Sequence, residues 1–95
     1  MKIRNINGLS QSKCKCGSWL KHWENFSNQS VPKFCMAENC TGTDLKGAHV
    51  QKDDSKDDKW YIYPLCGKHN AARGQTLDVT STYDLVSANV SETCG

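Results

Sequence analysis

The residue types and spacing of a metal site occur at four positions: Cys35, Cys40, Cys66 and His69. Two cysteines enclose four residues in CMAENC, and after a gap of 25 residues a cysteine and a histidine enclose two residues in PLCGKHN. Zn²⁺ takes four thiolate or imidazole ligands in a tetrahedron, and two short-spaced pairs far apart in a sequence commonly supply them. The spacing therefore predicts that these four side chains hold one Zn²⁺ ion.

A second group of candidate ligands consists of the remaining cysteines and one more histidine: Cys14, Cys16, His22 and Cys94. Three thiols and an imidazole are enough for a second zinc ion. The alternatives are a disulfide between Cys16 and Cys94 or thiols without a common partner, because a sequence does not fix connectivity. We therefore predict one zinc ion, and a second ion if these four side chains converge.

The composition indicates one small domain, residues 1–95, that needs more than its apolar core to be stable. Its 95 residues have a mean hydropathy of −0.68. A chain of this length buries only about 60–65 % of its unfolded surface, whereas a metal ion that binds the folded state alone adds stability. No export signal or long apolar stretch is visible, so we expect a reducing, cytoplasmic location, where clustered cysteines bind metals.

Basic side chains are concentrated near the start of the chain. Residues 1–23 contain five basic side chains and no acidic one, whereas the rest contains seven basic and ten acidic ones. Clusters of positive charge bind phosphate groups, so this segment favours contact with DNA or RNA. A solvated, solubilising segment is the alternative. The candidate phosphate contacts are Lys2, Arg4, Lys13, Lys15 and Lys21.

A short helix is expected just before the first ligand pair. Ser18 can cap a helix that runs from Trp19 to about Phe26. Three aromatic residues in it, at positions 19, 23 and 26, share one helix face. We expect this face to pack on the metal-bound core, because a small domain needs its few large apolar residues inside.

A β-hairpin is expected between the two ligand pairs. Residues 43–50 predict a strand with a kink or bulge at Gly47, and 51–58 predict a polar loop. Aromatic and β-branched residues at 60–64 predict the returning strand. A helical turn at 70–73 would follow the second ligand pair. The remaining apolar patterns predict further short strands at 77–82 and 83–90.

The succession of ligand pair, hairpin, ligand pair and helix resembles a treble-clef zinc finger. Within that class, the motifs are similar to those of the HNH nuclease family, because GAHV contains His49 and PLCGKHN contains Cys66, His69 and Asn70. The resemblance covers about residues 35–74. It implies a small α+β, zinc-stabilised domain with an HNH-like ββα core, flanked by a short helix and strands.

The resemblance also implies catalytic roles for two side chains. His49 would be the general base that takes a proton from the attacking water. Asn70 would help to hold Mg²⁺ or another divalent ion beside the scissile phosphate. Two positions depart from the family's pattern: Tyr61 stands where an asparagine orients the base, and Ala48 stands where an acidic residue is often found.

Because of these departures, we expect a non-catalytic, zinc-binding treble-clef module that binds nucleic acid or a protein partner. The first alternative is an HNH-like, metal-dependent endonuclease in which His49 is the general base. The second alternative is a small protein-binding factor, since the treble clef is reused for many functions and a fold does not fix a function.

Overall fold

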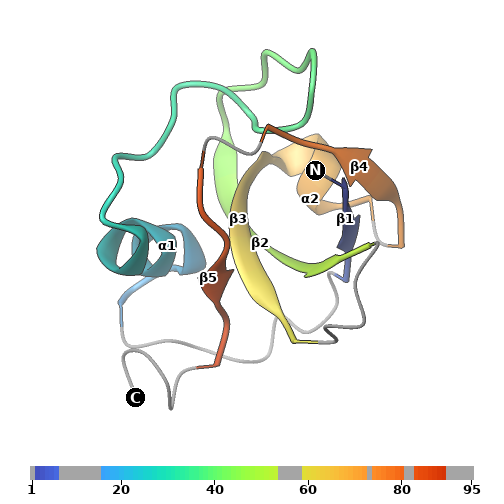
Figure 1. Cartoon of the computed structure of the whole chain (residues 1–95). Helices are drawn as coiled ribbons and strands as arrows, with labels where there is room; N and C mark the ends of the chain where they lie inside the picture. Colours follow the sequence, from blue (N-terminus) through green and yellow to red (C-terminus); the bar gives the residue numbers. More distant parts are fainter. Residues whose placement is uncertain (1, 7–15, 54–58, 73, 81–82, 90–95) are drawn as a thin grey trace.

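Five strands form one antiparallel sheet in the order β4-β1-β2-β3-β5 (Figure 1). The computed structural model describes residues 2–6, 16–53, 59–72, 74–80 and 83–89. The elements are β1 (Lys2–Asn5), α1 (Trp19–Ser27), β2 (Leu45–Lys52), β3 (Tyr61–Cys66), α2 (Gly67–Asn70), β4 (Thr76–Asp78) and β5 (Val86–Ser87). The predicted small α+β architecture is confirmed at this level, and no described helix is long and apolar enough to cross a bilayer.

The hairpin β2–β3 is the centre of the sheet and follows the predicted strands closely. Its register is unbroken from Leu45 opposite Cys66 to Val50 opposite Tyr61. Of the predicted kink or bulge at Gly47, the bulge is therefore wrong. Glycine is needed there for another reason: an added Cβ would lie 2.4 Å from the Trp19 carbonyl carbon. The backbone of α1 packs directly on β2 at this point.

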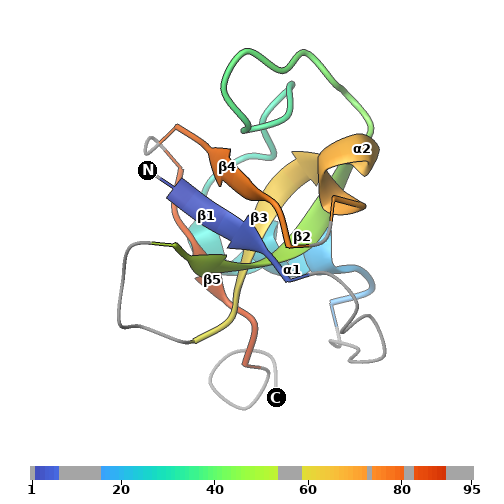
Figure 2. The same cartoon turned by 90° about the vertical axis from the view of Figure 1, so that its right-hand side faces the viewer.

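Strand β1, which the sequence reasoning did not predict, lies between β2 and β4 (Figure 2). Its residues alternate between exposed Lys2 and Arg4 and fully buried Ile3 and Asn5. This alternation is the period-2 pattern of a half-buried strand. A four-residue segment is too short for the pattern to stand out against its basic surroundings.

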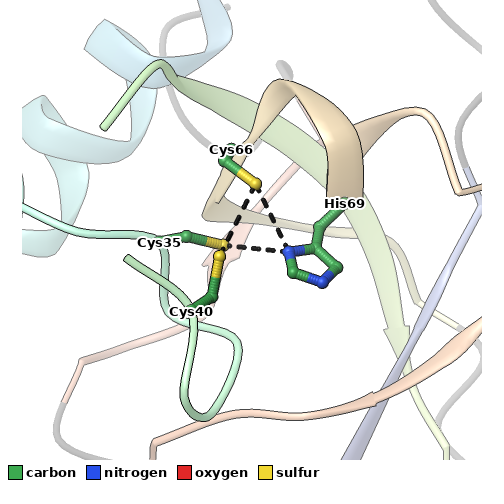
Figure 3. A group of neighbouring side chains, drawn as sticks. All are labelled: Cys35, Cys40, Cys66 and His69. Atoms are coloured by element: carbon green, nitrogen blue, oxygen red, sulfur yellow. Dashed lines mark hydrogen bonds between the residues drawn. The ribbon is translucent and has the colours of Figure 1, made fainter. Parts of the chain in front are cut away.

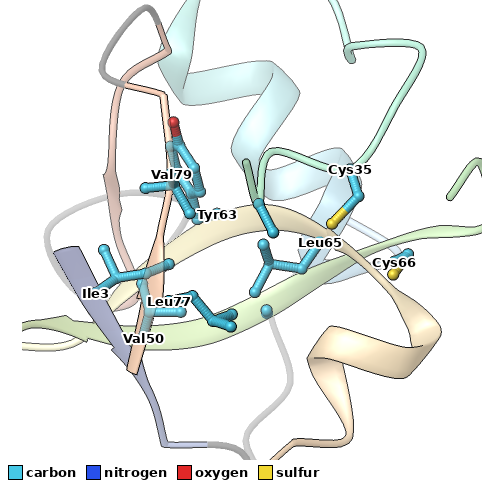
Figure 4. Packing of buried hydrophobic residues seen from close by; sticks show 10 residues of the cluster. Ile3, Cys35, Val50, Tyr63, Leu65, Cys66, Leu77 and Val79 are labelled. Carbon is cyan, nitrogen blue, oxygen red and sulfur yellow. The ribbon is translucent and has the colours of Figure 1, made fainter. Parts of the chain in front are cut away.

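The main hydrophobic core lies on the sheet face opposite α1 (Figure 4). Because successive strand residues point to opposite faces, Tyr63 and Leu65 enter this core while Ile62 packs with α1. Two of the candidate metal ligands, Cys35 and Cys66, belong to the main core. Its buried members are Ile3, Cys35, Ala37, Ala48, Val50, Tyr63, Leu65, Cys66, Leu77 and Val79.

Helix α1 forms as expected but packs elsewhere than expected. The Ser18 hydroxyl accepts a hydrogen bond from the Lys21 amide at 3.1 Å, which confirms the predicted N-cap. Trp23 is fully buried against Ile62 and Val86, in a cluster separate from Cys35 and Cys66, and Phe26 is 41 % exposed. The expectation that this aromatic face packs on the metal core is wrong, because the central strands lie between the two.

Helix α2 begins immediately after β3 and is a single turn, Gly67–Asn70. The predicted turn at 70–73 is therefore placed too late along the chain. The Asp44 carboxylate accepts a hydrogen bond from the Gly67 amide at 3.2 Å. This contact supplies the acceptor that a helix N-terminus needs, and it starts the helix early enough to include His69.

Candidate metal centre

The structure brings the four predicted ligands together where the first cysteine turn meets the β3–α2 junction (Figure 3). Their ligand atoms all lie within 4.8 Å of one another. The Nδ1 atom of His69 lies 3.4 Å from Cys35 Sγ and 3.3 Å from Cys66 Sγ. The sulfurs of Cys40 and Cys66 are 3.8 Å apart. These positions form a cluster that can hold a metal ion.

The distances fit a tetrahedral ion. With metal–sulfur bonds of about 2.3 Å and metal–nitrogen bonds of about 2.0 Å, tetrahedral angles separate two sulfurs by about 3.8 Å and a sulfur from a nitrogen by about 3.5 Å. A disulfide would require a separation of about 2.05 Å, much shorter than the 3.8 Å between the Cys40 and Cys66 sulfurs. Thiolate and imidazole donors suit soft or borderline ions better than Mg²⁺ or Ca²⁺.

A tight turn presents Cys35 and Cys40 to the centre. The Cys40 amide donates to the Ala37 carbonyl at 3.1 Å, and Asn39 within the turn has a φ of 63°. Asparagine is one of the few residues that adopt this left-handed conformation readily. The Cys35 amide donates to the Gly42 carbonyl at 2.8 Å, which closes the turn.

Gly42 lets this turn approach the second ligand pair. An added Cβ at this position would lie 2.7 Å from the Cys66 Cβ and 3.1 Å from its sulfur. The amide of the same glycine donates to the Cys40 sulfur at 3.5 Å. Gly42 therefore combines close packing with a hydrogen bond to a ligand, a role that the spacing of the cysteines did not reveal.

Asn5 is a buried residue that secures the helical turn carrying His69. Its side-chain amide donates to the carbonyls of His69 at 2.5 Å and of Asn70 at 3.0 Å. The last carbonyls of a helix lack donors within the helix, and the Asn5 amide supplements the Ala72 N–H group, which donates to the His69 carbonyl at 3.3 Å. The sequence reasoning missed Asn5, because 64 positions separate it from His69 and no local motif links them.

Burial and hydrogen bonding shift the pKa values of two of the thiols in opposite directions. Burial raises the pKa of Cys35 to about 11. The Gly42 N–H group lowers the pKa of Cys40, because it favours the thiolate. Metal ions bind thiolates, so an ion that enters this centre must displace the protons that remain.

The two residues with implied catalytic roles lie in different surroundings. His49 is only 4 % exposed, on the α1 face of the sheet, and its ring meets the Trp19 ring edge-on at 4.8 Å. Burial, with a smaller effect of His22, lowers the pKa of His49. Asn70 is the last residue of α2, and its carbonyl accepts the Asn5 hydrogen bond.

The second ligand group is described only in part, since Cys14 and Cys94 lie outside the described residues. Cys16 Sγ lies 3.9 Å from His22 Nδ1, and His22 is fully buried on α1. The opposite ring nitrogen, Nε2, lies 2.9 Å from the carbonyl oxygen of Ser87. The part that is described thus brings one predicted thiol and the predicted imidazole together.

The described basic candidates are separated in space. Lys2 and Arg4 are exposed on β1, and Arg4 donates to the Gln51 side chain at 2.9 Å. Lys21 is on α1 and forms an ion pair with Glu24 at 2.9 Å. The other two candidates, Lys13 and Lys15, lie outside the described residues.

Comparison with known protein families, curated proteins and solved structures finds no significant match to this chain. Its function must therefore be argued from the geometry of its own residues.

Proposed function

We propose that this chain is a treble-clef-like module stabilised by one structural Zn²⁺ ion. The observation that carries the proposal is the convergence of three sulfurs and one imidazole nitrogen within 4.8 Å. Four protein ligands fill a zinc tetrahedron and leave no position for water or substrate, which is typical of structural zinc sites. The bound ion would join the cysteine turn to the β3–α2 junction.

The order of elements around the ligands supports the treble-clef interpretation. The turn with Cys35 and Cys40 leads into the hairpin β2–β3, and Cys66 stands at the end of β3. His69 then follows on α2. In this arrangement the ion links segments that are distant in sequence, so it can supply stability that the small core lacks.

Nucleic acid is the partner that we favour for this module. The strand alternation of β1 leaves both Lys2 and Arg4 on its exposed side, and positive side chains on a small zinc-bound module suit contact with phosphates. The exposed rings of Phe26, Phe34 and Trp60, each more than 40 % exposed, offer surfaces for base stacking.

Titration of short labelled DNA and RNA duplexes at low and moderate salt tests this preference. We expect weaker binding at higher salt and a smaller salt slope for a Lys2→Ala, Arg4→Ala double variant, because fewer counterions are released. Lys46→Ala, an exposed lysine of β2, is the matched control. No binding at low salt would rule out nucleic acid as the partner. A protein recovered by pull-down in stoichiometric amount would then favour the protein-binding alternative.

The endonuclease alternative has less support from the geometry. A general base must come within hydrogen-bond distance of the water that it activates, whereas His49 is 4 % exposed and covered by Trp19. We therefore expect no plasmid nicking with Mg²⁺, Mn²⁺ or Ni²⁺. Nicking by the native chain that disappears in His49→Ala would establish the nuclease, whereas equal nicking by both proteins would indicate contamination.

A further inference from the structure

We propose that Cys16 and His22 hold a second soft divalent metal ion of the Zn²⁺ type, distinct from the ion proposed above. The first centre borders the main core, where Cys35 and Cys66 are buried. His22 lies on α1, which covers the opposite face of the sheet together with Trp23, Ile62 and Val86. Two separate ions would therefore stabilise two separate parts of the molecule.

The orientation of the His22 ring is that of a metal ligand. A carbonyl oxygen can only accept a hydrogen bond, so the contact with Ser87 at 2.9 Å assigns the proton to Nε2. In the neutral ring, Nδ1 then carries a lone pair, and this atom faces the Cys16 sulfur. Metal-bound histidines characteristically donate their other N–H group to a backbone carbonyl or carboxylate in this way.

The sulfur–nitrogen distance leaves space for an ion between the two groups. At 3.9 Å it is long for a hydrogen bond, and it also exceeds the edge of about 3.5 Å expected in a zinc tetrahedron. The corresponding distances in the first centre are 3.3 and 3.4 Å. A thiol and an imidazole thus face each other with room for a metal ion of this size.

His22 is fully buried, and its neighbours on α1 are aromatic. The rings of Trp19 and Phe26 both lie 5.0 Å from the His22 ring, measured between centroids. An apolar shell of this kind strengthens the attraction between a cation and a thiolate, because the local dielectric is low. Two ligands leave two positions of the tetrahedron for other donors.

Metal counting on the full chain tests the proposal. The reduced protein is loaded with Zn²⁺, separated from excess metal and weighed by native mass spectrometry. We expect two ions per chain, and one ion in both Cys16→Ser and His22→Gln. Glutamine can still donate to the Ser87 carbonyl, so this variant removes the metal ligand while it keeps the hydrogen bond.

A variant that disturbs the same helix without touching a ligand is the control. Ser18→Ala removes the N-cap of α1 and should retain two ions. Loading with Co²⁺ gives a second readout, because the thiolate-to-cobalt absorption should fall in Cys16→Ser and remain in Ser18→Ala. Two ions retained in Cys16→Ser and His22→Gln would overturn the proposal, since neither residue would then be a ligand.

The first centre is tested separately by Cys66→Ser. One ion in the native chain that is lost in Cys66→Ser and kept in Cys16→Ser would overturn the second site and leave the structural zinc proposal intact. Two ions in the native chain and in Cys66→Ser, with one in Cys16→Ser, would support the second site and contradict the first. The failures of the two proposals are thus distinguishable.

Discussion

At the scale of single residues, the proposed zinc ligands depend on neighbours that are not ligands. Gly42 allows the two ligand pairs to meet and donates to the Cys40 sulfur. Asn5 ties the carbonyl of His69 to β1. Hydrogen bonds and packing around the ligands fix the orientation of the ligand side chains and tune the metal affinity of the site. Substitutions next to the site are therefore as informative as substitutions of the ligands.

Replacement of Asn5 by aspartate should weaken the centre without removing a ligand. The carboxylate has the same size but cannot donate to the His69 and Asn70 carbonyls. We expect the free energy of unfolding to fall by about 1–3 kcal/mol, because a buried carboxylate would face two carbonyl oxygens in place of two hydrogen bonds, and zinc affinity to fall with it. Urea unfolding and competition with a chromophoric chelator measure the two effects.

Gln51→Glu is the matched control for this change. It makes the same replacement of an amide by a carboxylate, on the strand that pairs with β1 but away from the metal ligands. Its effect should stay within about 0.5 kcal/mol, as is usual for surface substitutions. Equal losses in the two variants would contradict the role of Asn5.

His49 should make the protein sensitive to mild acid. Its folded pKa is lowered by burial and then by His22, so the unfolded chain takes up the proton first as the pH falls. The stability that this neutral ring contributes is present above the usual histidine pKa of about 6.5 and is lost as the pH falls through its lower folded value. The loss is at most about 1.4 kcal/mol per pH unit.

His49→Phe keeps an aromatic ring against Trp19 and removes the titrating group. Between pH 7 and pH 5, we expect the free energy of unfolding to decline less steeply in this variant than in the native chain. The difference between the two proteins is the relevant quantity, since acid also protonates metal ligands in both. Parallel declines would show that His49 does not contribute to acid sensitivity.

At the scale of elements, the contact between α1 and β2 is the closest in the described structure around a glycine. The Cβ of an alanine at position 47 would lie 2.4 Å from the Trp19 carbonyl carbon and 2.5 Å from the Leu20 nitrogen. Both are backbone atoms, so the helix as a whole would have to move. The close packing of α1 on the hairpin therefore requires a residue without a side chain at position 47.

Gly47→Ala should accordingly be strongly destabilising. Overpacking in a well-packed region usually costs about 1–3 kcal/mol, and we expect a loss at the upper end of that range in urea unfolding. Gly67→Ala is the contrasting variant, since its Cβ would meet only the Asp44 side chain, 2.7 Å away, which can rotate at the cost of its hydrogen bond to the Gly67 amide, about 1 kcal/mol. A loss in Gly67→Ala as large as that in Gly47→Ala would argue against the close helix contact.

At the scale of the whole molecule, the proposed zinc ion connects the loop before the hairpin to the segment after it. The turn that carries Cys35 also bridges to the end of the sheet, where Ala37 pairs with Val79. Among the residues that the structure describes, ten buried ones form the main core, and two of these are ligand cysteines. Loss of the ion would thus expose part of the core as well as the site.

Chelation under reducing conditions should therefore abolish the cooperative unfolding transition or shift it to much lower temperature. Structural zinc contributes about 10–16 kcal/mol in zinc-finger peptides, whereas whole domains are stable by only about 5–15 kcal/mol. Thermal melts followed by circular dichroism measure the change. Re-addition of Zn²⁺ should restore the transition and Mg²⁺ should not; an unchanged melt in the chelated, metal-free protein would contradict the structural role of the ion.

Local features of the sequence were enough to predict several parts of this protein. The ligand pairs, the Ser18 cap of α1 and the strands of the hairpin depend on residues that lie close together along the chain, where residue type and period carry the information. The convergence of Cys35, Cys40, Cys66 and His69 followed from this local order and the usual chemistry of zinc.

Only the tertiary structure decided which surfaces these elements cover and which distant residues support the site. Contacts between segments far apart in the sequence include the pairing of β1, the hydrogen bonds of Asn5 to the turn of His69, and the packing of α1 on the face away from Cys35 and Cys66. Such contacts depend on strand pairing and on the side of the sheet that each residue faces. A short stretch of chain does not determine either property, because the partner and register of each strand depend on which face of the whole sheet is buried.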